Sequence, residues 1–150
     1  MKTMADDTGH TAGYELPLLL FAGFRSLMDQ SCAELARLGH PGIRPLYGFA
    51  LRAIGPGGAT AAGIARRLGV SHQAAAKAVG RLESLGYVER TADPADARRK
   101  LVLLTPRGLD ALDRSTAVFE QARAGWASAL GAERLHALES DLRTMAPPGR

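Results

Sequence analysis

The stretch TAAGIARRLGVSHQAAAKAVGRLESLGYVERTADPADARRKLVLLT, residues 60–105, decides the fold. Its first part predicts a short amphipathic helix, because Ile64 and Leu68 lie four residues apart on one helical face. Gly69 ends this helix, since glycine is favoured just beyond a helix C-terminus. Ser71 then predicts the start of a second helix, because its hydroxyl can accept a backbone N–H from the next helical turn.

The second helix is predicted to run to about Leu85 and to end at Gly86. Apolar residues recur on its inward face at helical spacing, and they are Ala75, Ala78, Val79, Leu82 and Leu85. The outward face near the N-terminus is small, polar and cationic, with His72, Gln73, Ala76 and Lys77. Two short helices joined by a tight turn, the second with such an exposed end, indicate a helix-turn-helix.

Two aliphatic segments follow, and they predict the strands 87–89 and 100–104. The stretch 91–99 between them is too polar for a strand by this criterion and contains Pro94 and two aspartates, which favour turns. The expected result is a hairpin with a basic tip. A helix-turn-helix followed by a basic hairpin is a winged helix.

These motifs together resemble the MarR (multiple antibiotic resistance regulator) family of bacterial transcription factors. The matching segments are IARRLGVSHQAAAKAVGRLESLGYVER and DPADARRKLVLLTPRG, with the Asp-x-Arg of the wing at Asp96 and Arg98. The resemblance implies a mainly α fold with a small β-hairpin wing, in the α+β class. It also implies that N- and C-terminal helices form a dimerisation region around the winged helix-turn-helix.

The excess of positive charge is concentrated in the same stretch. Residues 60–105 hold eight Lys/Arg against four Asp/Glu, whereas residues 1–59 hold five of each and residues 106–150 hold six of each. The whole net charge of +4 therefore lies on the predicted winged helix. Such a concentration favours binding to phosphates over charge placed merely for solubility.

The remaining chain divides around this module. Residues 1–13 are small and polar and are expected to be disordered, 14–41 and 106–146 to be the helical dimerisation region, and 42–105 to be the DNA-binding domain. Helices are predicted over 16–38 and 44–54, and the first is apolar on nearly all sides in its front half. That pattern suggests burial by a second subunit. The Gly-Pro-Gly-Gly run at 55–58 is read as a linker, because no Gly-Lys-Ser/Thr follows it.

After the wing, Thr105 and Pro106 predict the cap and first position of a long helix. Its apolar residues form a narrow seam of coiled-coil type, namely Leu109, Leu112, Phe119, Trp126 and Leu130. Gly131 interrupts it, and a last helix carries leucines at helical spacing. The seam is more than one winged helix can cover, which again favours a homodimer.

Specific roles in DNA binding follow from the predicted helix and wing. Gln73 can read adenine, His72 or Lys77 can reach guanine or phosphate, and Ser71 with the helix N-terminus can hold a phosphate. Arg98 is expected in the minor groove, with Asp96 orienting it, as the resemblance implies. The full set of predicted DNA-binding residues is Ser71, His72, Gln73, Ala76, Lys77, Arg81, Asp96, Arg98, Arg99 and Lys100.

The chain departs from the family pattern at four positions. Ala75 and Ala76 stand where a β-branched residue and serine are common, and Ala97 and Leu103 stand where arginine is frequent. The recognition helix therefore offers few hydrogen bonds to bases. We expect relatively more reliance on DNA shape and phosphate contacts.

The resemblance also implies a small aromatic or phenolic effector bound between the dimerisation helices and the winged helix. The residues expected to line that site are Phe24, Met28, His40, Arg44 and Tyr47, with Arg44 able to pair with a carboxylate. An ordinary core and surface role for these residues is the alternative. Cys32 is expected to be a buried, inert thiol, and the four histidines share no metal-ligand spacing, so no metal or other cofactor is predicted.

The leading hypothesis is a homodimeric, ligand-responsive repressor that binds a pseudo-palindromic operator in double-stranded DNA. Alternatives are an architectural DNA-binding protein without effector and a winged helix that binds proteins. An enzyme is disfavoured, because GxSxG, P-loop, HExxH and paired-carboxylate motifs are missing. The sequence contains no run of 18 apolar residues, so no membrane span is predicted. The N-terminus lacks the apolar core of a signal peptide, so a cytoplasmic location is expected.

Overall fold

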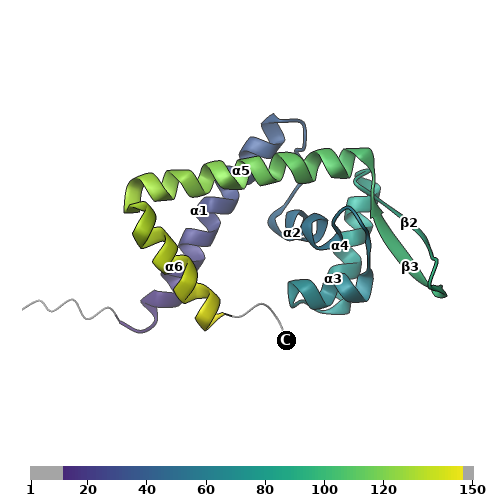
Figure 1. Cartoon of the computed structure of the whole chain (residues 1–150), viewed down its shortest axis with the longest axis horizontal. Helices are drawn as coiled ribbons and strands as arrows, with labels where there is room; N and C mark the ends of the chain where they lie inside the picture. Colours follow the sequence, from purple (N-terminus) through teal and green to yellow (C-terminus); the bar gives the residue numbers. More distant parts are fainter. Residues whose placement is uncertain (1–11, 147–150) are drawn as a thin grey trace, which may run out of the picture.

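A winged helix and a long helical arm make up the molecule, and Figure 1 shows them on opposite sides of the view. The computed structural model describes residues 12–146, so the expectation of disorder over 1–13 falls almost entirely outside the described residues. The elements in chain order are α1 (Glu15–Arg37), α2 (Pro45–Ile54), β1 (Ala59–Thr60), α3 (Ala61–Leu68), α4 (His72–Ser84), β2 (Val88–Asp93), β3 (Asp96–Leu104), α5 (Pro106–Leu130) and α6 (Ala132–Met145). The mainly α fold with a hairpin wing is thereby confirmed.

The core lies in the winged helix, where α2, α3 and α4 pack together. Ile64 and Leu82 are wholly buried, and so is Tyr87, which lies between α4 and β2. The predicted boundaries of the helix-turn-helix are correct, because Gly69 ends α3 in the left-handed conformation and Ser71 caps α4. Small residues let α4 approach the neighbouring helices closely. Ala75, for example, has no exposed surface.

The sheet contains one strand that the sequence did not suggest. Its order is β1-β3-β2, all antiparallel, with Ala59 opposite Val102. Gly58 precedes β1 with φ +78°, and a Cβ added there would lie 2.6 Å from a Leu103 side-chain carbon and 2.9 Å from the Val102 carbonyl oxygen. The Gly-Pro-Gly-Gly run is therefore more than a linker, since it delivers the chain tightly onto β3.

The wing strands are longer than predicted. β2 and β3 keep their pairing out to Ala92 and Lys100, and a register shift follows before Asp93 pairs with Asp96. The expectation that 91–99 is a polar loop was wrong, because only Pro94 and Ala95 form the tip. Most side chains of the outer hairpin are exposed, so their polarity does not oppose pairing of the backbone.

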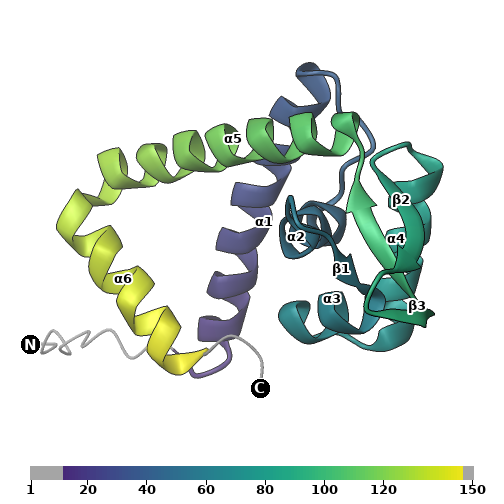
Figure 2. The same ribbon diagram turned by 45° about the vertical axis from the view of Figure 1, so that its right-hand side comes forward.

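The arm consists of α1, α5 and α6, which form the three sides of a triangle in Figure 2. α5 runs from the end of the wing to the far corner, packs along α1 and then turns at Gly131 into α6. The front half of α1 is largely exposed, and its large apolar side chains with exposed fractions of 44–62% are Leu16, Leu18, Leu19, Leu20, Phe21 and Phe24.

The seam predicted on α5 is not the face that this helix buries within the chain. The buried residues of α5 are mostly small and are Gly108, Ala111, Ser115, Val118 and Ala122. Leu109, from the predicted seam, is 40% exposed. The seam was predicted to be covered by a second subunit, and that prediction stays open. Within the chain, small side chains allow the close approach of α5 to α1. No helix within residues 12–146 is long and apolar enough to span a membrane.

Candidate nucleic-acid interface and effector pocket

The N-terminal turn of α4 presents an exposed polar surface. The Ser71 hydroxyl accepts a hydrogen bond from the Ala74 N–H at 3.1 Å, which fixes the helix start. His72, Gln73 and Lys77 are all exposed beyond that cap. Ala76 and Arg81 are exposed as well. The geometry therefore leaves the predicted recognition residues of α4 free of the core.

The wing carries a second exposed cluster of positive charge. Asp96 Oδ1 accepts a hydrogen bond from the Arg98 backbone N–H at 3.0 Å, and Asp96 Oδ2 lies 3.5 Å from Arg99 Nε. Asp96 thus fixes the backbone at Arg98 and pairs with Arg99. Within residues 12–146, the Arg98 guanidinium has no hydrogen-bond or ion-pair partner, so it is available to a ligand.

The two surfaces meet in a basic hollow of about 340 Å³. α3 contributes Arg66, α4 contributes His72, and β3 contributes Arg99 and Lys100. Arg66 was not among the predicted binding residues. Its position two residues after Ile64 on an amphipathic helix indicated only that it faces solvent, and the fold was needed to bring it to the wing.

Two other arginines of the winged helix are engaged in structure. Arg67 donates a hydrogen bond to the Ala53 carbonyl and thereby ties α3 to α2. Arg90 Nε lies 3.5 Å from a carboxylate oxygen of Glu83 and links β2 to α4. The basic excess of the segment is thus divided between structural contacts and the exposed surface.

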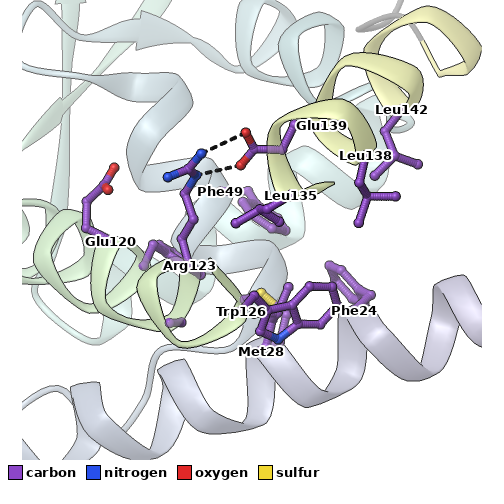
Figure 3. A pocket seen from close by; sticks show the side chains of 13 residues that line it. Phe24, Met28, Phe49, Glu120, Arg123, Trp126, Leu135, Leu138, Glu139 and Leu142 are labelled. Atoms are coloured by element: carbon purple, nitrogen blue, oxygen red, sulfur yellow. Dashed lines mark hydrogen bonds and ion pairs between the residues drawn. The ribbon is translucent and has the colours of Figure 1, made fainter. Parts of the chain in front are cut away.

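An apolar pocket of about 390 Å³ lies between α1, α2, α5 and α6, and Figure 3 shows its side chains. Its aromatic residues are Phe24, Phe49, Phe119 and Trp126. The rings of Phe49 and Phe119 stack with centroids 6.5 Å apart, and Phe24 lies 6.4 Å from Phe49. Met28, Leu135 and Leu138 complete much of the wall.

One ion pair lies at the side of this pocket. Arg123 Nε and Nη2 donate to the two carboxylate oxygens of Glu139 at 2.6 and 2.9 Å, so the pair is bidentate (Figure 3). The hydrogen bond to Arg123 lowers the pKa of Glu139, which keeps the carboxylate ionised at neutral pH. The pair joins α5 to α6 beside the pocket.

The predicted effector residues are only partly brought together. Phe24 and Met28 line the pocket, whereas His40, Arg44 and Tyr47 are not among its lining residues. His40 is buried with both ring nitrogens in hydrogen bonds, so it fits the ordinary core role that was the alternative. The contribution of α6 was missed, because nothing in the spacing of its leucines indicated that they face Trp126.

Cys32 lies in the second half of α1 and is partly buried. Burial, with a smaller effect of the Asp29 carboxylate, raises the pKa of the thiol. The group is therefore a thiol and not a thiolate at neutral pH, which supports the prediction of low reactivity.

The fold and the exposed basic surfaces define a winged helix-turn-helix protein with a helical arm. Residues 42–99 match the MarR family model. The match covers the winged helix of this chain, and the whole chain shares its fold with solved regulators of that family.

Several solved structures share this fold over nearly the full length. A MarR-family transcriptional regulator from Rhodococcus sp. RHA1 is 21% identical, with a TM-score of 0.74, over 93% of this chain and 97% of that chain. CouR from Rhodococcus jostii RHA1, bound to p-coumaroyl-CoA, is 22% identical, with a TM-score of 0.74, over 94% and 98%. A mutant MarR from E. coli complexed with operator DNA is 24% identical, with a TM-score of 0.76, over 89% and 94%. No curated protein sequence matches this chain.

Proposed function

We propose that the protein is a DNA-binding transcriptional regulator that acts as a ligand-responsive homodimeric repressor. The observation that carries the proposal is the joint surface of α4 and the wing, where exposed basic and polar side chains surround one hollow. The operator complex of the E. coli relative supports DNA as the partner for this fold.

The dimer is proposed from the arm. The exposed side chains in the front half of α1 form an apolar surface whose contact with water is unfavourable. α6 adds Leu142 and Met145, with exposed fractions of 39% and 81%. A second copy of the chain would cover them. Two recognition helices would then meet half-sites about 34–36 Å apart on one face of a pseudo-palindromic operator.

The proposed DNA contacts keep the roles predicted for them. Gln73 reads a base edge in the major groove, while His72 and Lys77 reach guanine or phosphate. Arg98 enters the minor groove, and the hydrogen bond from its backbone N–H to the Asp96 carboxylate fixes the backbone at this position. Phosphate contacts come from Ser71, Arg81, Arg99 and Lys100, with Arg66 added because it shares the hollow.

The effector is proposed to be a small aromatic molecule in the pocket between the arm and α2. Four aromatic rings and several aliphatic side chains supply an apolar binding surface. The p-coumaroyl-CoA complex of CouR supports an aromatic ligand for a protein of this fold. Because Arg123 is already paired with Glu139, an acidic ligand has to compete for it.

The function is tested by fluorescence anisotropy on the DNA upstream of the protein's own gene and on a scrambled duplex, at several salt concentrations. Preference for the native sequence, with affinity that falls steeply in salt, is the expected result. Equal weak binding to both duplexes would favour an architectural protein. No binding to either at low salt would overturn the proposal and leave a protein-binding winged helix.

Ligand binding has a built-in reporter, because Trp126 is the one tryptophan of the sequence and lines the pocket. Titration with phenol, cinnamyl alcohol and cinnamate is expected to change its fluorescence in a saturable manner. Phe49→Ala enlarges the pocket without touching the DNA surface and serves as the matched variant. Lack of any saturable change, with DNA binding intact, would contradict the effector and leave a constitutive regulator.

A further inference from the structure

A buried polar junction joins three parts of the molecule that the proposed function does not explain. His40 follows α1 and is 3% exposed, and Tyr87 precedes β2 and is wholly buried. His40 Nδ1 lies 3.0 Å from the Tyr87 hydroxyl, and His40 Nε2 lies 2.8 Å from Asp110 Oδ2 in the first turns of α5. The junction therefore connects the end of α1, the beginning of the wing and the beginning of α5.

Two arginines of α5 complete the junction. Arg107 Nη2 donates to the Tyr87 hydroxyl at 3.1 Å and lies over the Tyr87 ring, with the guanidinium carbon 4.7 Å from the ring centroid. The same Nη2 lies 3.4 Å from the Gly39 carbonyl. Arg114 Nε donates to Asp110 Oδ2 at 2.9 Å. The Gly108 position is equally tight, because an added Cβ would clash with the Tyr87 carbonyl oxygen.

The hydrogen bonds have one consistent direction when His40 is neutral. Hydrogen bonds from His40 and Arg114 lower the pKa of Asp110, so its carboxylate only accepts and the imidazole proton resides on Nε2. Burial raises the pKa of Tyr87, so its hydroxyl keeps its hydrogen. Arg107 can only donate, and the Tyr87 hydroxyl must therefore donate to His40 Nδ1.

A second proton on His40 is incompatible with this arrangement. Nδ1 then carries a hydrogen and becomes a donor, so the Tyr87 hydroxyl loses its acceptor. The phenolic oxygen would also receive donors from two cations, the imidazolium and the Arg107 guanidinium. The ion pair with Asp110 becomes stronger, but Asp110 is half-exposed and is already shared with Arg114. An unsatisfied buried donor is costly in comparison with a solvated ion pair.

We propose that His40 couples the arm to the wing in a way that depends on its protonation. Neutral His40 holds the arm and the wing together through its hydrogen bonds, and protonated His40 releases Tyr87 and Arg107. Its consequence for DNA binding depends on the proposed function, whereas its effect on the junction does not. The groups that face the ring are Tyr87 and Asp110, and the charged groups bonded to those partners are Arg107 and Arg114. In the last turns of α1, Glu34 and Arg37 are paired with each other.

The junction itself is tested by NMR of the full-length protein labelled with ¹⁵N-histidine. At pH 7.5, His40 is expected as the neutral tautomer with a proton on Nε2 and an unprotonated Nδ1. As the pH is lowered from 7.5, protonation of Nδ1 is expected to be accompanied by a shift of the Thr105 amide, which is bonded to the Tyr87 carbonyl. Protonation of Nδ1 at pH 7.5, or a tautomer that never changes, would overturn the proposal.

The functional consequence is tested with two matched variants. Tyr87→Phe removes only the hydroxyl, and His40→Gln keeps a donor and an acceptor but cannot be protonated. His72 on α4 is the same in all three proteins, so its contribution to any pH dependence cancels in the comparison. Between pH 7.5 and 5.5, the wild type is expected to lose about fivefold in DNA affinity relative to Tyr87→Phe, the effect of one buried hydrogen bond.

If the DNA affinities of the wild type and of both variants changed in parallel with pH, the proposed coupling would be overturned. If no protein binds DNA at any pH while NMR shows the tautomer change, then the regulator hypothesis fails and the proton-sensitive junction stands. Should one variant fold poorly by circular dichroism, the other still provides the comparison with the wild type.

Discussion

The winged helix and the arm of this protein bury their apolar residues to very different degrees. Leu82, near the C-terminal end of α4, has no exposed surface, whereas Leu19, in the front half of α1, is 62% exposed. Both residues lie on helices rich in apolar side chains. The winged helix therefore completes its core within one chain, and the arm does not. The proposed dimer would account for this difference, because a second copy of the chain would cover the exposed side chains of the arm.

The largest expected effect comes from removing core volume in the winged helix. Leu82→Ala is expected to lower the free energy of unfolding by about 2–5 kcal/mol, because it leaves a cavity in a fully buried site. The matched change in the arm, Leu19→Ala, is expected to lower the free energy of unfolding far less when it is measured at low protein concentration. Urea unfolding followed by circular dichroism measures both. Equal losses at low concentration would show that the arm has a core of its own.

The next effect concerns the unpartnered surface of α1. Leu18→Asp combined with Phe21→Asp is expected to convert the proposed dimer to a monomer, since both side chains are about 60% exposed in the single chain. Light scattering measures the mass. Loss of the second recognition helix is expected to weaken operator binding by about a hundredfold.

Gln30→Asp, an acidic change at an exposed polar position further along the same helix, is the control. A double variant that remains dimeric would place the subunit contact elsewhere on the arm.

A smaller effect is expected from the wing. Arg98→Ala is expected to reduce DNA affinity roughly tenfold, because an unpaired guanidinium at the hairpin is removed. Titrations should show a similar loss of affinity for the native duplex and for the scrambled duplex. The control is Arg134→Ala, which removes an exposed arginine from α6. Unchanged affinity after Arg98→Ala would contradict a DNA-contacting wing.

The smallest effect is expected at the link between α5 and α6. Arg123 lowers the pKa of Glu139 below its usual value of 4.5, so the pair stabilises the fold above that pH and ceases to do so as the pH falls through the lowered value. Glu139→Gln is therefore expected to lower the thermal midpoint slightly at pH 7. The difference from wild type should vanish in acid. A constant difference at every pH would mean that the carboxylate charge is not involved.

Local patterns were sufficient to predict the helix-turn-helix. Gly69 and Ser71 specify backbone conformations through chemistry that acts within one turn, so the ends of α3 and α4 could be placed from sequence. The exposure of the basic residues of the wing was also predictable, since charged side chains are stable in water, although they lie on β3 and not at the tip.

Contacts between distant segments could not be predicted in the same way. β1 exists because Ala59 pairs with Val102, 43 positions later, and a two-residue strand has no periodicity. His40 was assigned to an effector site, yet its partners Tyr87 and Asp110 are brought to it only by the fold. The small buried face of α5 escaped notice because alanine and serine mark a close helix contact without forming an apolar stripe.

α5 also has a mechanical consequence. Its 25 residues run without interruption from the wing to the corner beside Trp126, a length of about 37 Å at ~1.5 Å per residue. A rigid rod of that length acts as a lever: a tilt of about 5° at the pocket end displaces the other end by about 3 Å. In a dimer, two such levers would alter the separation of the recognition helices, and DNA with a fixed helical repeat of about 34 Å tolerates little of that change.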